Sequence, residues 1–310
     1  MTSASITSEL AEDVSVLEPT VGDFLQLMKP RVMTLVVLTA LAGMVAAPGS
    51  LHPVLAVIAI VAISIGAGAS GALNMWYDAD IDKQMARTAA RPIPRGRVTP
   101  DEALYFGAIL SVLSVMTLGV LVNWVAGGLL ALTIGYYVFF YTMWLKRKTP
   151  HNIVIGGAAG AFPPMIGWAC VTGNVGIESV VLFLIIFMWT PPHFWALALL
   201  RLRDYERVGV PMLPVVAGTA ETRRQILIYS VFLVPLAILP PFLGVGGYAY
   251  GATASVMGAM FLYYAFDVWR KTEGRPAEQA CKRLFWFSIL YLYLLFAVLL
   301  VESAAMKYWA

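Results

Sequence analysis

Long apolar stretches, separated by shorter polar segments, recur along the whole chain. Each is about twenty residues long, which is the length a helix needs to cross some 30 Å of hydrocarbon. The pattern predicts nine transmembrane helices, at 30–48, 53–73, 103–122, 124–145, 153–172, 177–200, 226–246, 249–269 and 284–303. The chain is therefore expected to be an all-α polytopic membrane protein.

Composition supports this class. Of the 310 residues, 60% are hydrophobic and only 13% are charged, about half the charged fraction of a soluble domain. Residues 1–23 contain five acids but no Lys or Arg and no apolar run, so they do not resemble a secretory signal. We expect a disordered acidic tail over 1–23 and one nine-helix membrane domain over 24–310.

The basic residues are distributed asymmetrically between the two sides of the membrane. When the connections are numbered alternately, all 21 Lys and Arg residues except Lys307 fall on one side. That side contains the start of the first helix and the loops 74–102, 146–152, 201–225 and 270–283. We expect the protein in the cell (inner) membrane. The positive-inside rule places the basic side and the N-terminus in the cytoplasm, and the C-terminus on the outer side. The net charge of +3 thus reflects topology and does not indicate a nucleic-acid partner.

An acidic segment directly follows the second apolar stretch. Asn74, Asp78 and Asp82 are spaced four residues apart, so on a helix they stay within an arc of roughly 80°. Asp80 points away from this line. Oxygen ligands at a membrane edge suit magnesium, which commonly lies between carboxylates and a substrate's phosphates. The line therefore predicts a magnesium site.

Two other interpretations of this segment are a calcium loop and an ordinary solvated helix end. A calcium loop starting at Asp78 would need Gly at its sixth position and Glu at its twelfth, where the chain has Lys83 and Ala89. An ordinary solvated helix end would also carry acids. Ionisable clusters at membranes are usually functional, which favours the metal site.

Basic residues lie close to the acids in the predicted loops. Arg87 and Arg91 follow the acidic line, and the loop 146–152 contains Lys146, Arg147 and Asn152. Such a loop can simply anchor the topology. Acids and bases at one membrane face also suit a diphosphate, whose charge both a metal and cations neutralise.

The sixth stretch contains a histidine inside the membrane. Pro191 and Pro192 precede His193 and predict a broken helix beside a cavity, although a lone intramembrane His is often structural. The loop that follows brings Arg203 and Asp204 to the same membrane face as the acidic line.

Taken in order, these motifs resemble those of the UbiA-type intramembrane prenyltransferases, and within them the branch that farnesylates haem. The resemblance covers roughly residues 24–300. Its motifs are Asn74-x-x-x-Asp78-x-x-x-Asp82, Arg87-Thr, Arg91-Pro, Lys146-Arg147, Asn152-Ile-Val-Ile-Gly-Gly, Pro191-Pro-His193-Phe-Trp and Gly209-Val-Pro-Met-Leu-Pro214. It implies nine helices around a cavity that opens to the cytoplasmic face.

The resemblance also implies a reaction. A farnesyl group would pass from farnesyl diphosphate to a vinyl group of haem B, with addition of water, to give haem O and diphosphate. Mg²⁺ would be held by Asn74, Asp78 and Asp82, and haem B is a substrate, not a cofactor. Membrane lipid and a downstream haem A synthase are the other implied partners.

Further roles follow from the same resemblance. The residues implied to act on the diphosphate, beside the three metal ligands, are Arg87, Lys146 and Arg147. The implied substrate-binding residues are Arg91, Asn152, His193, Arg203 and Asp204.

The chain departs from the superfamily pattern at one place. Most relatives have a second pair of aspartates after the sixth helix, whereas this loop offers Asp204 and Glu206. His193 lies near the position of the missing acid. It would instead serve the haem, either as an iron ligand or as a partner of a propionate.

Two other functions stay open at this point. A prenyltransferase for a quinone or chlorophyll-type acceptor would share the acidic line. A transporter needs polar groups at the membrane midplane, whereas the charge clusters here lie at one face.

The predicted topology can be tested by cysteine-accessibility labelling. We expect positions 95 and 310 to be labelled from opposite sides of the membrane, because the basic loops are cytoplasmic and the C-terminus is not. Labelling of both positions from one side would contradict the helix count.

Overall fold

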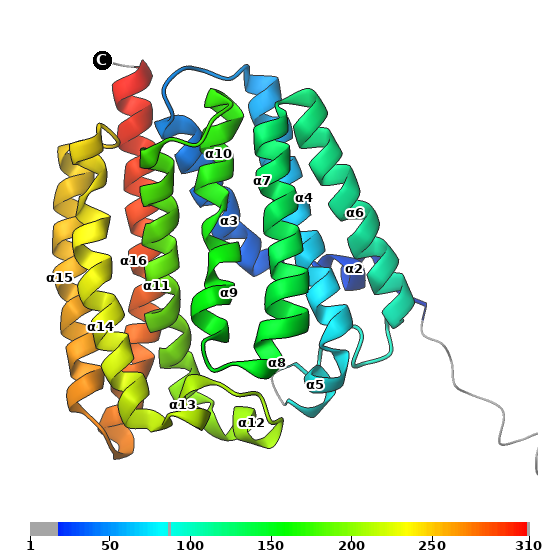
Figure 1. Cartoon of the computed structure of the whole chain (residues 1–310), viewed down its shortest axis with the longest axis vertical. Helices are drawn as coiled ribbons and strands as arrows, with labels where there is room; N and C mark the ends of the chain where they lie inside the picture. The colour runs from blue at the N-terminus through cyan, green and yellow to red at the C-terminus, as the bar shows by residue number, and fades with distance from the viewer. Residues whose placement is uncertain (1–17, 86–87, 309–310) are drawn as a thin grey trace, which may run out of the picture.

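The computed structural model describes residues 18–308 apart from 86 and 87, and among these residues it is helical without a strand. Figure 1 shows the long helices running side by side. The elements are α2 (Val21–Leu27), α3 (Pro30–Ala46), α4 (Pro53–Tyr77), α5 (Ala79–Gln84), α6 (Pro100–Leu121), α7 (Trp124–Gly135), η1 (Tyr136–Leu145), α8 (Lys146–Lys148), α9 (Asn152–Ala161), α10 (Pro163–Thr172), α11 (Ile177–Leu200), α12 (Leu202–Arg207), α13 (Leu213–Val216), α14 (Gly218–Ile238), η2 (Pro240–Leu243), α15 (Tyr248–Arg270) and α16 (Gly274–Tyr308).

The helices identify an integral membrane protein. Within the described residues, six helical segments are long and apolar enough to cross a membrane, and α2 with α3, bent by 56°, makes a seventh if counted as one span. Helices α14 and α15 are not among these. The expected seventh stretch, 226–246, is shifted: α14 begins at Gly218 and ends at Ile238, because Pro240 and the glycines after it stop the helix.

The proline pairs act differently in the two helices that contain them. Pro163 and Pro164 interrupt the fifth expected stretch, because α9 ends at Ala161 and α10 begins at Pro163. The break predicted at Pro191 and Pro192 is wrong, because α11 continues through both. Its flanks are buried against α9, α14 and α16, and such neighbours hold a helix together where proline removes backbone donors.

The first described helix begins earlier than the tail boundary expected at residue 23. Thr20 caps α2, and Asp23 closes a capping box by accepting the Thr20 backbone N–H at 2.9 Å. These bonds satisfy backbone donors that a helix start otherwise leaves free. Helical structure therefore includes residues 21–23.

Of the three buried clusters in the described residues, a small one includes Leu27 and Ile93, and the two largest each occupy one half of the bundle. One joins α3, α4, α7 and α10, and the other joins α11, α14, α15 and α16. Helices α3 and α10 approach so closely that a Cβ on Gly43 would overlap the Pro164 carbonyl, and one on Gly167 the Ala40 carbonyl. Small residues permit this contact, as is common between membrane helices.

The periphery is apolar and exposed. In the most apolar 18 residues of α6, 22% are buried inside the protein, whereas 67% are buried in the corresponding stretch of α9 and α10. α6 is therefore peripheral and presents its side chains to lipid, while α9 and α10 lie inside the bundle, as Figure 1 also shows.

The two ends of the bundle differ in charge and in structure. The short helices α5, α8, α12 and α13 gather at one end, and the C-terminal end of α16 lies at the other (Figure 1). Lys307 lies at that opposite end and donates to the Ala47 carbonyl, at 3.1 Å, after α3. The separation of Lys307 from the basic loops agrees with the asymmetry in the sequence.

A carboxylate joins α16 to the start of α15 near that end. Glu302 accepts the backbone N–H groups of Gly247, Ala249 and Tyr250, each at 2.8 Å.

We expect Glu302→Gln to lower the free energy of unfolding by about 2 kcal/mol, because an amide cannot accept all three bonds. Unfolding in mixed detergents measures this. Glu178→Gln is the control, because the Glu178 carboxylate accepts no hydrogen bond from the described residues. An equal loss of stability in both variants would contradict the role of Glu302.

Candidate active site

The predicted acidic line lies where α4 turns into α5. Asp78 ends one helix and precedes the other, yet the backbone ladder continues across it: Asp78 N–H bonds to the Asn74 carbonyl at 3.0 Å, and Asp82 N–H to the Asp78 carbonyl at 2.8 Å. The side chains of Asn74 and Asp78 meet, with Nδ2 donating to Oδ2 at 2.6 Å. The four-residue spacing therefore brings these groups together as expected.

Burial separates this line from an ordinary helix end. Asn74, Asp78 and Asp82 are only 5%, 0% and 2% exposed. A solvated helix end would leave them in water, so that interpretation is wrong. The side chain of Asp80 is 60% exposed and turned away from the line, as predicted.

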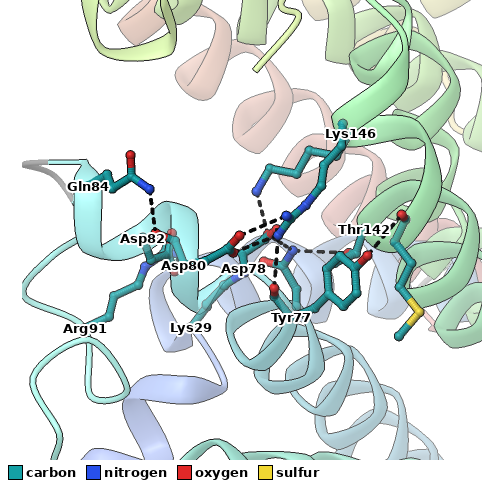
Figure 2. Close-up of polar contacts among 12 residues, drawn as sticks. Lys29, Tyr77, Asp78, Asp80, Asp82, Gln84, Arg91, Thr142 and Lys146 are labelled. Atoms are coloured by element: carbon teal, nitrogen blue, oxygen red, sulfur yellow. Dashed lines mark hydrogen bonds and ion pairs between the residues drawn. The ribbon is translucent and has the colours of Figure 1, made fainter. Parts of the chain in front are cut away.

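Two cations compensate the buried carboxylates. Lys146 of α8 contacts Asp78 Oδ2 through Nζ at 2.5 Å, and Arg91 contacts Asp82 Oδ2 through Nη1 at 2.5 Å. Figure 2 shows the two cations reaching the acids from opposite sides. Ionised groups in a low-dielectric surrounding require such partners, which places the basic loop 146–152 directly over the acids.

Arg147 is used differently from Lys146. Its guanidinium holds Asp80 through two bonds of 2.8 and 2.9 Å, donates to the Tyr77 carbonyl at 3.2 Å and stacks 4.9 Å over the Tyr77 ring. These bonds lower the pKa of the Asp80 carboxyl. Arg147 also forms a longer ion pair with the line itself, because its Nη2 lies 3.8 Å from Asp78 Oδ1. Arg147 thus fastens α8 to the junction of α4 and α5.

Lys29 belongs to the site, although sequence reasoning assigned it only to topology. It lies between α2 and α3, and its Nζ donates to Asn74 Oδ1 at 2.7 Å. Its φ of 53° makes it the one non-glycine residue with a left-handed backbone among those described. This conformation is costly for a side chain with a Cβ and commonly marks a functional position. In the sequence, only the proline that follows Lys29 hints at an unusual backbone at this position.

Thr142 was also missed. It accepts Asn74 Nδ2 at 3.1 Å and lies in η1, a π-helical segment that continues α7. Such segments are rare and are often found at functional sites. Thr142 stands in an apolar run, and no spacing in the sequence marks it.

The donors fit a divalent cation. Asp78 Oδ1 is fully buried and has no hydrogen-bond partner, which is expensive for a carboxylate oxygen. No group of three His, Cys, Asp or Glu side chains forms a metal cage in the described part of the chain. Magnesium needs no such cage, since one or two carboxylates, water and substrate phosphates suffice. The Asn74 oxygen is engaged by Lys29.

Three of the predicted residues lie apart from the acids. Asn152 starts α9, with Nδ2 bonded to the Thr149 carbonyl at 2.7 Å and Oδ1 buried without a partner. Arg203 and Asp204 of α12 line a different cavity of about 440 Å³, which no residue of the acidic line reaches. Arg87 lies outside the described residues.

The two long loops nevertheless touch. Arg207 of α12 donates from Nη2 to the Gln84 carbonyl at 2.7 Å. This bond places the loop after α11 against the end of α5.

His193 also stands apart, deep within α11. It is 8% exposed, its Nδ1 lies 2.7 Å from Ser288 Oγ, and it stacks between Trp189 and Phe285. It is therefore buried, as an intramembrane position predicts, but it touches none of the acids.

An apolar groove adjoins Lys29. It measures about 490 Å³ and lies between α2, α3 and α4. Its lining residues are Leu25, Met28, Pro30, Met33, Thr34, Val37, Ser64 and Ile65.

A helical membrane bundle with buried carboxylates and cations at one face is the arrangement expected of an intramembrane prenyltransferase. The family model described as the UbiA prenyltransferase family matches residues 36–305. The chain belongs to this family.

Relatives and solved structures extend the comparison. The chain is 67% identical to protoheme IX farnesyltransferase of Parvibaculum lavamentivorans, over 91% of this chain and 88% of that protein. It is 60% identical to protoheme IX farnesyltransferase of Rhizobium leguminosarum bv. trifolii, over 96% and 94%.

Two solved structures share the fold at low identity. A structure of digeranylgeranylglyceryl phosphate synthase has a TM-score of 0.75 at 17% identity, covering 91% of this chain and 98% of that one. A UbiA homologue from Archaeoglobus fulgidus, bound to GPP and Mg²⁺, has a TM-score of 0.66 at 17% identity, covering 89% and 99%.

The pairing of Lys146 with Asp78 predicts a non-additive effect on stability. We expect Lys146→Met to cost about 3 kcal/mol of unfolding free energy, because it leaves a buried carboxylate without its partner. Adding Asp78→Asn should recover most of this loss. The free energy of unfolding in mixed detergents measures both.

The control is Lys148→Met, which removes an exposed neighbouring charge and should change stability by less than about 0.5 kcal/mol. If the double variant instead shows the sum of the two single losses, Lys146 and Asp78 do not interact.

Proposed function

We propose that the protein transfers a farnesyl group from farnesyl diphosphate to a vinyl group of haem B, with addition of water, to give haem O and diphosphate. The observation that carries this proposal is the buried Asp78–Asp82 pair, which is held by cations and has one carboxylate oxygen, Asp78 Oδ1, without a hydrogen bond. The farnesyl and haem specificity is supported by relatives 60–67% identical that bear the name protoheme IX farnesyltransferase.

The diphosphate binds over the acidic line. Three cations, Arg91, Lys146 and Arg147, match three carboxylates there. The Lys29 side chain lies beside them on Asn74 Oδ1, so one further basic group is available to the phosphate oxygens. Lys29, Lys146 and Arg91 exchange part of their contact with protein oxygens for phosphate oxygens, and Arg147 stays with Asp80. Arg87, four residues before Arg91 in the sequence, is assigned to the same diphosphate by the resemblance alone.

Asp78 and Asp82 would hold magnesium, and Asn74 would join them once Lys29 releases its amide oxygen. When bound there, magnesium would supply charge stabilisation to the departing diphosphate. An A. fulgidus homologue with the same fold is bound to GPP and Mg²⁺, which supports this assignment.

The reaction begins with ionisation of the allylic carbon–oxygen bond. Lys146, Arg91 and Lys29 stabilise the leaving diphosphate, while burial of the site keeps bulk water from the allylic cation. The haem vinyl group supplies the electron pair for the new carbon–carbon bond. Water then adds to the cation beside the porphyrin ring and loses a proton, which gives the hydroxyethylfarnesyl substituent.

The apolar groove next to Lys29 receives the isoprenoid chain. Met28 and Pro30, the neighbours of Lys29, both line it, so a diphosphate bound by the ammonium directs its tail toward this groove. Haem contacts come from Asn152, from His193 and from Arg203 and Asp204 on α12. The unpartnered Asn152 Oδ1 supports its part in this set.

The membrane arrangement completes the proposal. The domain spans the cell membrane nine times, with the N-terminus and the substrate cavity at the cytoplasmic face and the C-terminus outside. The concentration of Lys and Arg at one end of the bundle supports this orientation. Haem O leaves to a haem A synthase.

Charge at the acidic line is predicted to control turnover. We expect Asp78→Asn and Asp82→Asn each to lower the rate at least 100-fold, and most severely at limiting magnesium, since the amide keeps the shape but loses the metal-binding charge. Both variants should insert into membranes and bind haem B. Formation of haem O, followed by chromatography, measures the rate.

Asp101→Asn is the matched control, because Asp101 is an exposed carboxylate in the first turn of α6 at the same membrane face. Its rate should stay normal. Near-normal turnover of Asp78→Asn or Asp82→Asn at limiting magnesium would show that the metal assignment is wrong.

A further inference from the structure

The imidazole of His193 is enclosed on nearly every side. Its faces stack on Trp189 at 4.4 Å and on Phe285 at 4.8 Å, with interplanar angles of 15° and 19°. The Phe194 ring is nearly perpendicular to the imidazole, with 5.1 Å between the ring centroids. Nδ1 lies 2.7 Å from Ser288 Oγ. The ring is therefore fixed in position and in orientation.

The neighbours of Ser288 determine which ring nitrogen carries the proton. Ser288 Oγ lies 2.7 Å from the Phe285 carbonyl oxygen as well as 2.7 Å from His193 Nδ1. Two oxygens this close must share a proton, and the serine hydroxyl is the only one of the two groups that has one. Ser288 therefore donates to Phe285 and accepts a hydrogen bond from His193, so Nδ1 carries the proton.

The ring is neutral, and Nε2 has a bare lone pair. His193 forms no ion pair with an acid among the described residues, so a second proton would be an unpaired buried charge. Nε2 also has no hydrogen-bond partner among the described residues. It is not fully buried, unlike the six side-chain atoms there that are buried without a partner. The small exposed part of the residue therefore includes the Nε2 edge.

A bare imidazole nitrogen discriminates between the two haem contacts considered for His193. It repels a propionate carboxylate, which needs a donor, whereas it is a good ligand for iron. Metal-binding histidines usually donate their other ring N–H to a fixed acceptor, which sets the tautomer and strengthens the ligand. Ser288 provides that acceptor.

We propose that His193 Nε2 is an axial ligand of the haem iron and that Ser288 is the positioning residue that presents it. The inference rests on the proposed function, since haem B is the substrate there. Trp189 supports the arrangement by donating from Nε1 to the Ser288 carbonyl at 2.8 Å, which links α11 to α16. The haem is thereby bound in a single orientation through its iron, and other residues contact its propionates.

Haem binding by the purified full chain in detergent tests this proposal. Ferric protohaem is titrated into the wild type and into His193→Ala, Ser288→Ala and Ser288→Thr, and the complexes are then reduced with dithionite. Absorption spectra report the ligand, and resonance Raman spectra report the iron–histidine stretching band. The control is Ser230→Ala, because Ser230 is equally buried and bonds to a carbonyl of its own helix, far along the chain from His193.

We expect His193→Ala to lose the iron–histidine band and to regain a nitrogen-ligated spectrum when imidazole is added. Ser288→Ala should retain the band at a lower frequency, because Nδ1 loses its acceptor, and should weaken haem binding about tenfold. Ser288→Thr should restore the wild-type frequency, and Ser230→Ala should not change it.

The wild-type band persisting in His193→Ala would overturn the ligand assignment. An unchanged frequency and affinity in Ser288→Ala would overturn the positioning role. The mass of the porphyrin product separates this failure from that of the proposed function. If no haem O forms but the band depends on His193, the function fails and the ligand assignment stands, whereas haem O formation with a band indifferent to His193 means the reverse.

Discussion

Keeping Asp78 and Asp82 ionised in a buried position is the constraint on which the site depends. An isolated buried carboxylate is too costly to persist, so each must have a cation within contact distance. Lys146 and Arg91 meet that requirement from two different loops, and the Lys29 ammonium engages Asn74 from a third segment. The loops at this end of the bundle are therefore held together by the same charges that are proposed to bind the diphosphate.

This constraint also explains how one cluster can serve both folding and catalysis. Without substrate, the cations neutralise the carboxylates. When diphosphate and metal bind, cations and anions can exchange partners inside one network. Asp78 Oδ1 is the atom at which the network is incomplete, and Arg147 anchors it by holding Asp80 on the exposed side. The aromatic enclosure of His193 is separate from this network, which fits a division between diphosphate and haem.

The sequence predicts much of this arrangement, and the failures have physical causes. The side chains of Asn74 and Asp78 meet because their spacing matches the helical period, and the backbone ladder continues across Asp78 to Asp82. Lys29 and Thr142 could not be predicted as site residues, because one depends on a left-handed backbone and the other on a π-helical segment. Pro191 and Pro192 misled because tertiary packing keeps α11 intact. Arg203 and Asp204 share a membrane face with the acids but line a different cavity, which periodicity cannot distinguish.

The central claim is that the buried acid–base cluster ionises farnesyl diphosphate for transfer to haem B. The most direct measurement incubates the purified protein with haem B, farnesyl diphosphate and magnesium in oxygen-labelled water, and weighs the porphyrin product. The expected product is a porphyrin heavier by one farnesyl group and one hydroxyl group, with the label in that hydroxyl group. An unmodified porphyrin, together with prenylation of a quinone-type acceptor under the same conditions, would contradict it.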